Sequence, residues 1–199
     1  MKTNSAILLL VLPVLLGAPG CSSPTREVPL NTVSFPDVSL PSPSSKRDGT
    51  LNVQVTDTRA EKPTVGKMSG RIGANAIFVI GGGLEPRMAE ILKDALERAG
   101  YSVAPTAKAK LEAEILEFKV YANGWTQGAK ETIRFYLRGK DGAVLWERTA
   151  KGEDGGMDLV DSFATKSMNV ALTRLLTNAI HEFKSESFSQ SVQKSAEEK

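Results

Sequence analysis

Cysteine and histidine are almost absent from this chain of 199 residues, which contains one of each, Cys21 and His181. A single cysteine excludes a disulfide within the chain, so the fold must rest on a hydrophobic core. One histidine without a second soft ligand does not make a typical zinc site. Nucleophilic catalysis needs a base beside its nucleophile, and no such pair is visible. We therefore expect a protein that is not an enzyme and that binds no cofactor or metal.

An excess of charge of one sign is also missing, because 25 Lys and Arg face 23 Asp and Glu. A surface that binds nucleic acid needs a basic excess, so we expect no nucleic-acid partner. The longest apolar stretch, residues 6–16, is shorter than the roughly 20 residues that cross a bilayer. With Lys2 before it and small residues after it, this stretch has the pattern of a secretory signal peptide over residues 1–20.

Cys21 stands immediately after that signal, and two processing routes are open. Residues 16–21, Leu-Gly-Ala-Pro-Gly-Cys, resemble the lipobox of bacterial lipoproteins, in which the cysteine thiol takes a diacylglycerol. Ala18-Pro19-Gly20 also resembles an ordinary cleavage site, which would release a soluble protein. A secreted protein rarely keeps one unpaired thiol, which favours lipidation of Cys21. Ser22 implies the outer membrane, on its periplasmic face, with acyl chains as the membrane contact.

Residues 21–49 are rich in proline and are predicted to be a lipid-anchored tether. Proline fixes φ and removes an amide donor, so this segment is unsuited to the interior of a sheet. A Pro-rich linker rises by about 3.1 Å per residue, which allows a reach of up to roughly 85 Å. Part of the segment could instead dock as an edge strand or meet a partner.

Residues 50–184 are predicted to form a single domain. Apolar alternation predicts strands at residues 51–56 and 132–138, and a turn at Asp141-Gly142 leads into another at 143–151. An apolar run predicts a further strand at 76–80. Residues 110–121 also alternate, with a change of phase that indicates a β-bulge, although a helix is compatible with the same residues. The strands at residues 110–121, 132–138 and 143–151 would form an antiparallel meander. Residues 61–75, with their glycines and proline, are expected to be a loop.

Two amphipathic helices complete the predicted domain, one from Leu84 to a stop at Gly100 and one ending at Phe183. Asp158 and Asp161 would lie at the start of the second helix, where the helix dipole favours negative charge. The fold class is therefore α+β: a two-layer sandwich of a mostly antiparallel sheet of about five strands, with both helices on one face. Residues 185–199 are expected to be a polar, disordered C-terminal tail.

Few residues are candidates for a functional site. Asp57 and Arg59 are predicted to close the end of a strand as a structural ion pair. Trp125, close to Tyr121 at an expected hairpin tip, is a candidate contact for a partner, a glycan or a membrane surface, or alternatively covers the core. Trp146 is expected in the core. The remaining candidates are better explained by turns, solvation and capping than by chemistry: Gly81–Gly83, Glu112, Glu114, Asp154 and His181.

These features together resemble the YajG-type family of bacterial lipoproteins. The resemblance rests on Val53 to Arg59, on Asp94 to Leu96 with Ala99 to Val103, on the strand from Leu111 and on the closing helix. It implies an outer-membrane lipoprotein of unassigned biochemical role, with no enzymatic residues to carry over.

We therefore expect a membrane-tethered binding or assembly module whose partner is an envelope protein or polymer. An alternative is an accessory lipoprotein of a lipid or lipopolysaccharide transport system. It would hold amphipathic cargo between helices and sheet, so a deep apolar cavity would favour it and a filled core would oppose it.

Overall fold

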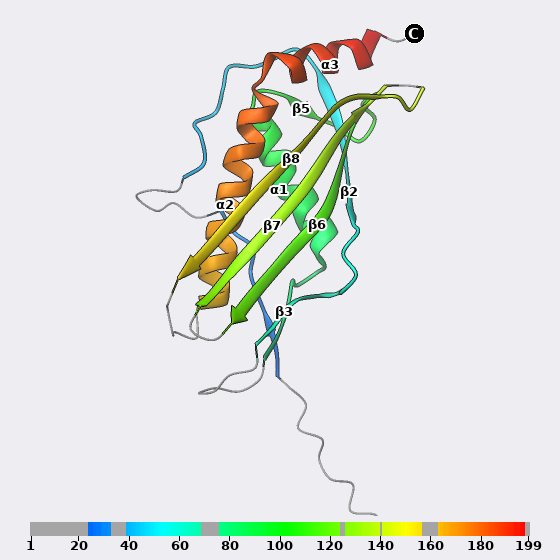
Figure 1. Ribbon diagram of the computed structural model, residues 1–199. Helices are drawn as coiled ribbons and strands as arrows, with labels where there is room; N and C mark the ends of the chain where they lie inside the picture. The colour runs from blue at the N-terminus through cyan, green and yellow to red at the C-terminus, as the bar shows by residue number, and fades with distance from the viewer. Residues whose placement is uncertain are drawn as a thin grey trace, which may run out of the picture.

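The computed structural model describes residues 24–32, 39–68, 76–123, 126–139, 141–156 and 163–197. Figure 1 shows the strands and helices formed within these ranges. The strands are β1 (Thr25–Glu27), β2 (Thr50–Asp57), β3 (Thr64–Met68), β4 (Ala76–Val79), β5 (Ser102–Val103), β6 (Ala109–Asn123), β7 (Thr126–Arg138) and β8 (Val144–Gly156). The helices are α1 (Leu84–Arg98), α2 (Phe163–Phe183) and α3 (Glu186–Glu197).

The main sheet has five strands in the order β5-β2-β6-β7-β8. Strands β6, β7 and β8 form the predicted antiparallel meander, whereas β2 pairs parallel with both β5 and β6. The register between β6 and β7 shifts between Ile115 and Glu117. The predicted bulge is therefore confirmed, because the apolar alternation of β6 changes phase at that point. A helix over residues 110–121, the alternative interpretation, is excluded.

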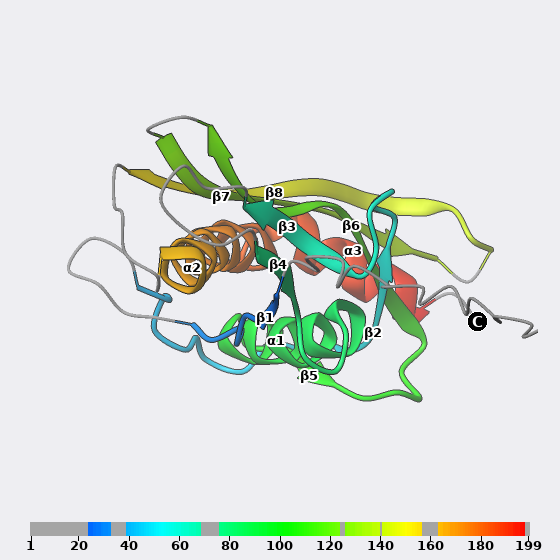
Figure 2. The ribbon, with the colours of Figure 1, turned by 90° about the horizontal axis from the view of Figure 1, so that it is seen from below.

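Helices α1 and α2 lie side by side on one face of this sheet, as Figure 2 shows. Apolar residues three or four positions apart give α1 one buried stripe, made of Leu84, Met88, Ile91, Leu92, Ala95 and Leu96. Gly100, with φ of 100°, follows the helix as the predicted stop. The other face of the sheet carries the alternate polar residues, as is common for antiparallel sheets. The predicted α+β fold class is confirmed.

A second, smaller sheet has the strand order β1-β4-β3. Strand β3 lies within residues 61–75, so the prediction of a loop is wrong for Thr64–Met68, while residues 69–75 lie outside the described ranges. Gly66 explains the misleading signal. A Cβ there would stand 2.7 Å from the carbonyl oxygen of Val120, so this glycine allows β3 to approach β6 and does not mark a turn.

Much of the N-terminal segment is docked on the domain. Strand β1 pairs parallel with β4, and Val28 and Leu30 are buried at 1% and 2% exposure. The side chain of Asn169 on α2 accepts a hydrogen bond from the Asn31 amide and donates one to the Pro29 carbonyl. The prediction of a tether spanning all of residues 21–49 is therefore wrong, and the alternative, that part of the segment docks as an edge strand, is confirmed for β1. The segment docks because the apolar side chains between its prolines bury themselves in the hydrophobic core.

Residues 39–49 also follow the surface of the domain. The Ser44 amide donates to the Arg98 carbonyl at 2.8 Å, and the Arg47 amide donates to the Gly100 carbonyl at 2.8 Å. Leu40 packs against the core. The Lys184 side chain, just after α2, also donates to the Ser42 carbonyl at 3.1 Å. The segment therefore follows the C-terminal ends of both α1 and α2.

The predicted disordered tail is wrong for residues 186–197, which form α3. Phe188, Val192 and Ser195 are buried at 0%, 1% and 3% exposure, and their spacing places them on one face of the helix. The ring of Phe188 packs against Tyr101, Trp146 and Phe183, with centroids 4.7–5.3 Å apart. The polar composition concealed this helix because only a few of its residues are apolar.

Candidate functional site

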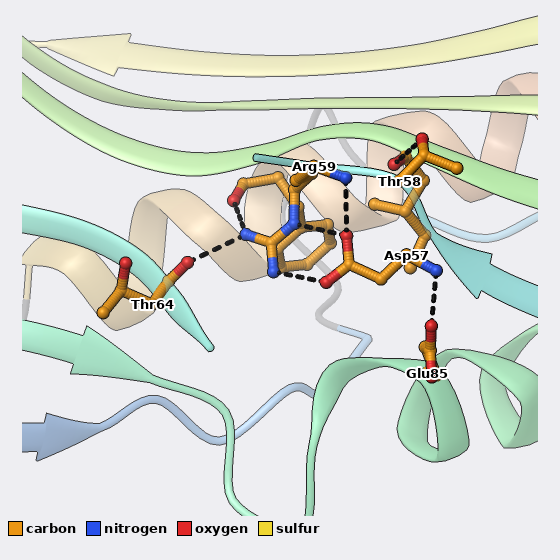
Figure 3. A network of polar contacts seen from close by, with 7 residues as sticks. Asp57, Thr58, Arg59, Thr64 and Glu85 are labelled. Atoms are coloured by element: carbon orange, nitrogen blue, oxygen red, sulfur yellow. Dashed lines mark hydrogen bonds and ion pairs between the residues drawn. The ribbon is translucent and has the colours of Figure 1, made fainter. Parts of the chain in front are cut away.

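Asp57 and Arg59 form an ion pair at the end of β2, in the arrangement that the sequence suggested (Figure 3). Arg59 Nε donates to Asp57 Oδ1 at 2.9 Å, and Nη2 donates to Oδ2 at 2.8 Å. The two side chains are only 8% and 6% exposed. A planar guanidinium matches a carboxylate in this two-bond geometry, which is among the stronger polar contacts in proteins.

The pair connects four elements of the fold. Arg59 Nη1 donates to the carbonyl oxygens of Thr64 on β3, at 3.0 Å, and Phe118 on β6, at 2.8 Å. On the other side, the Asp57 amide donates to Glu85 Oε1 in the first turn of α1, at 2.6 Å. We call this group of five residues the strand-end clasp. It joins the two sheets and α1 at the end of β2.

The charge state of the clasp suits a structural role. Burial would raise the pKa of Asp57, but hydrogen bonds from the Arg59 side chain and backbone, with the positive charge of Arg59, lower that pKa below its ordinary value. Asp57 is therefore ionised at neutral pH. Both of its carboxylate oxygens are engaged by Arg59, so the geometry favours alignment of strands over proton transfer.

A second buried carboxyl, that of Glu131 on β7, was not among the sequence candidates. Glu131 is 1% exposed, and neither of its carboxyl oxygens has a hydrogen-bond partner among the described residues. It faces the helices, as do Ala129 and Ile133 on either side of it. The two-residue period of β7 was the available signal, because Glu131 falls on the inward positions of that strand.

Helix α2 packs closely on the sheet beside Glu131. The residue opposite it on β8 is Gly152, and a Cβ added there would collide with the carbonyl oxygen of Ala171 on α2. Burial raises the pKa of Glu131 well above its ordinary value. The protonated form is the one that an apolar environment accommodates.

Tyr121 lies near the tip of the meander, where β6 ends. It pairs with Gly128 on β7, and a Cβ on Gly128 would come within 2.5 Å of the Tyr121 hydroxyl, so the ring lies over this glycine. Lys130 Nζ is 5.5 Å from the ring centroid and 3.0 Å from Glu153 Oε1. Trp125 and Cys21, the other two candidates, lie outside the described residues, so the structure places neither of them beside Tyr121.

The remaining candidates lie apart from one another. Trp146 is buried at 5% exposure, as predicted, and His181 is exposed. Glu112 forms an ion pair with Arg138 at 2.6 Å, and Asp154 lies 3.2 Å from Arg174. Asp158 and Asp161 are outside the described ranges. Within those ranges, no three His, Cys, Asp or Glu side chains are grouped so as to hold a metal ion.

A groove of about 710 Å³ runs along the free edge of β8 beside α3. We call it the edge groove; it is lined by residues 144–149 of β8 and by Ser187 and Ser191 of α3. Val144 at its mouth is 46% exposed, which is unusual for a large apolar side chain in the described part of the chain. Sequence reasoning missed the groove because it predicted no helix after residue 184.

The hydrogen bonds along this edge define its open stretch. Side chains of Arg174 and Asn178 on α2 donate to the carbonyls of Glu153 and Lys151, and Ser191 on α3 donates to the carbonyl of Leu145. These carbonyls point away from β7. Thr149 lies two residues before Lys151 on β8, and backbone groups along an antiparallel strand alternate sides with every residue. The amide and carbonyl of Thr149 therefore also point away from β7. Neither has a partner among the described residues, and the edge is therefore open at Thr149 between two covered ends.

Comparison with known proteins gives a family match. Residues 36–137, just over half of the chain, match the model of a family described as uncharacterized lipoprotein. The search of curated proteins found no match. None of the described helices combines the length and the hydrophobicity needed to cross a bilayer.

Several solved structures are similar to this chain to different degrees. Protein XCC0632 from Xanthomonas campestris has a TM-score of 0.60 at 15% identity, covering 85% of this chain and 99% of that one. A PelC dodecamer from Paraburkholderia phytofirmans has a TM-score of 0.44 at 15% identity, covering 75% and 97%. Lipoprotein GNA1162 from Neisseria meningitidis has a TM-score of 0.42 at 12% identity, covering 68% and 99%. At these identities, the first of them shows a common fold and nothing about ligands.

Proposed function

This chain belongs to the family of uncharacterized lipoproteins, and from that membership we propose that it is a non-enzymatic, lipid-anchored binding or assembly module of the bacterial cell envelope. The proposed anchor is an acylated Cys21, exposed by removal of residues 1–20, and Ser22 favours the outer membrane. The YajG-type resemblance of Val53 to Arg59 supports the same assignment at a finer level. The partner we propose is another envelope protein.

The observation that carries this function is the open edge of β8. An exposed strand edge is a template for an extended segment of another chain, which adds main-chain hydrogen bonds to the sheet. Here the backbone of Thr149, which has no partner in the described part of the chain, lies in the edge groove that is also lined by the exposed Val144. The covered ends of the edge limit such a segment to a short stretch, which favours a specific partner over unlimited strand addition.

The interior favours this module over the cargo carrier. The space between α1, α2 and the sheet is occupied by a continuous cluster of buried side chains. A carrier of amphipathic cargo needs an apolar cavity between these layers, whereas the edge groove lies at the surface and opens to solvent. The candidate catalytic groups support a non-enzymatic role, since Glu112 is held by Arg138 and His181 lies apart on α2.

In-cell photocrosslinking tests the proposal. The lipidated full chain carries a photoreactive amino acid at Val144, or at Glu90 on the exposed side of α1 as the matched control. We expect a discrete adduct with an envelope protein from position 144 only. Thr149→Pro should reduce that adduct about tenfold, the equivalent of one hydrogen bond of roughly 1.4 kcal/mol, because proline removes the outward amide donor. Thr149→Val should retain it. Equal adducts from both positions, or a Pro variant that crosslinks normally, would contradict the proposal.

A further inference from the structure

We propose that the domain stands directly on the lipid surface, with one defined end facing the headgroups. This inference rests on the proposed lipidation of Cys21 and adds an orientation to it. We call that end the anchor end: it comprises the start of β1, the end of β3, the start of β4 and the tip of the meander at Asn123 and Thr126. The opposite, far end comprises the turn between β7 and β8 and helix α3.

The first step is the attachment of the N-terminal segment. The Pro24 carbonyl accepts a hydrogen bond from the Ile77 amide at 3.0 Å, and the Val28 amide donates to the Val79 carbonyl at 2.9 Å. Between them β1 is paired with β4 along its whole length. The burial of Val28 and Leu30 adds hydrophobic contact to these hydrogen bonds. The chain is therefore held by the domain between Pro24 and Leu30.

The second step is the distance from this attachment to the anchor. Cys21 precedes Pro24 by three residues. Even a fully extended chain spans at most about 3.6 Å per residue, so the two Cα atoms lie no more than about 11 Å apart. The headgroup region of a bilayer is about 5–8 Å deep on each side. An acylated Cys21 would thus bring the start of β1 to the headgroups and not tens of ångströms above them.

The third step identifies what else lies at this level. Thr25 and Lys67 both pair with Ile77, from the two neighbouring strands, and Met68 pairs with Ala76. The start of β1, the end of β3 and the start of β4 are therefore at one end of the small sheet.

Strand β3 also runs alongside β6 in the same direction. The carbonyls of Thr64 and Phe118 share Arg59 Nη1, and two residues further along each strand Gly66 abuts Val120. The end of β3 consequently points toward the tip of the meander, as can be followed at the lower end of Figure 1.

Charge at the anchor end suits an anionic lipid surface. Lys67 and Lys119 are exposed there, and Lys119 stands opposite Lys130. Lys119 pairs with Glu117 at 2.7 Å and Lys130 with Glu153 at 3.0 Å, whereas Lys67 has no ion pair among the described residues. A lysine near an anionic bilayer contributes about 1 kcal/mol of attraction. Lys67 is accordingly the side chain best placed to meet lipid phosphates.

The far end is well separated from this surface. Strand β7 has 13 residues from Thr126 to Arg138, which corresponds to about 40 Å of extended chain. The Ser195 hydroxyl on α3 donates to the Arg138 carbonyl at 3.1 Å, so α3 lies at the far end. The edge groove, which begins at Val144, would therefore be presented away from the lipid, where a partner can reach it.

Fluorescence quenching tests the orientation. Full-length lipidated protein is reconstituted into phosphatidylethanolamine–phosphatidylglycerol vesicles that contain a quencher on the lipid headgroup. A fluorophore is attached at Lys67→Cys on β3 or at Lys194→Cys on α3, two exposed lysines at opposite ends, while the Cys21 thiol is consumed by its thioether. We expect at least about fivefold stronger quenching at position 67, because the two ends are about 40 Å apart. Equal quenching at both positions would overturn the inference.

A second variant tests the short attachment. Twenty Gly/Ser residues inserted between Ser23 and Pro24 add a flexible coil of roughly 25 Å, so the difference between the two positions should disappear. A position-67 preference that survives the insertion would overturn the short attachment as its cause. Failure of the proposed lipidation is distinguishable: the protein would not float with the vesicles, and mass spectrometry would find a free thiol at Cys21. Vesicle-bound protein with equal quenching would refute the orientation alone.

Discussion

The two halves of the meander are held by different kinds of contact. Toward the anchor end, the contacts that align the elements are polar and buried: the strand-end clasp and the amide of Asn169. The carboxyl of Glu131, which has no hydrogen-bond partner within the described ranges, lies in the same half. Toward the far end, the rings of Tyr101, Trp146, Phe183 and Phe188 pack together. Removing one partner of a buried ion pair or hydrogen bond is what most lowers the free energy of unfolding there. In an aromatic cluster, the largest loss comes from removing side-chain volume. Different kinds of substitution should therefore destabilise the two halves.

The largest expected effect is at the far end, on deletion of α3. Ending the chain after Ser185 removes the buried Phe188 and Val192, each of which contributes about 1.5–3 kcal/mol on burial, so the free energy of unfolding should fall by about 3–6 kcal/mol. Urea denaturation of the mature chain with Cys21→Ser, followed by Trp fluorescence, measures this loss. Coincident curves for the full and shortened chains would mean that α3 contributes nothing to the core.

Arg59→Ala should be nearly as damaging at the anchor end. It leaves the ionised Asp57 buried without a partner, and such a loss costs about 3–5 kcal/mol. The double variant with Asp57→Asn should recover part of this loss, because the unpaired charge is then absent. The same denaturation assay applies, and a stable Arg59→Ala protein would refute the structural role of the clasp.

Arg138→Ala is the matched control for the clasp at the far end. Its ion pair with Glu112 is about one-third exposed on both sides, so water screens it and its loss should cost far less stability than loss of the buried Asp57–Arg59 pair. A loss as large as that of Arg59→Ala would remove the contrast between the two halves.

Glu131→Leu should stabilise the protein. The unfolded-state pKa of a glutamate is about 4.3, and the raised pKa in the folded state means that the unfolded chain releases this proton first as pH rises. Stability is therefore unaffected by Glu131 below about pH 4.3 and decreases above it, up to the folded-state pKa. At pH 7 the free energy of unfolding of the variant should be about 1–3 kcal/mol higher, because the substitution removes a buried polar group with no hydrogen-bond partner among the described residues.

Urea denaturation of wild type and Glu131→Leu at several pH values checks this prediction. The difference between the two proteins should increase from acid to neutral pH, and subtraction cancels the opposite contribution of Asp57, whose stabilisation is lost as pH falls. A difference that stays constant with pH would mean that Glu131 is solvated and has the same pKa in the folded and unfolded states, which would contradict the prediction.

A small effect on global stability is expected from Asn169→Ala, which removes the side-chain hydrogen bonds to the Asn31 amide and the Pro29 carbonyl. Global stability should fall by only about 1–2 kcal/mol, while amide hydrogen exchange at Asn31 should accelerate, because the segment opens locally. Unchanged protection at Asn31 would show that β1 pairing alone holds the segment.

Local pattern made most of the main domain predictable. The stripe of α1, the meander, the bulge after Ile115 and the Asp57–Arg59 pair all follow from spacings of a few residues, which side-chain periodicity encodes directly. Glu131 was accessible to the same reasoning, but its polar character obscured its inward position. The docking of Val28 and Leu30 could not be predicted from the sequence. Proline content indicates the backbone conformation of the segment, but not which surface of the domain binds it.

The sequence alone determined the single cysteine, its position after a signal-like stretch, the balanced charge and the two apolar helices, since these are properties of composition and short-range order. Only the tertiary structure decided that the N-terminal segment is bound from Pro24, that α3 covers the far end and that the edge of β8 is open at Thr149. Each of these depends on contacts between residues far apart in the chain. The few apolar side chains involved stabilise the structure only because the folded core provides an apolar surface against which they are buried.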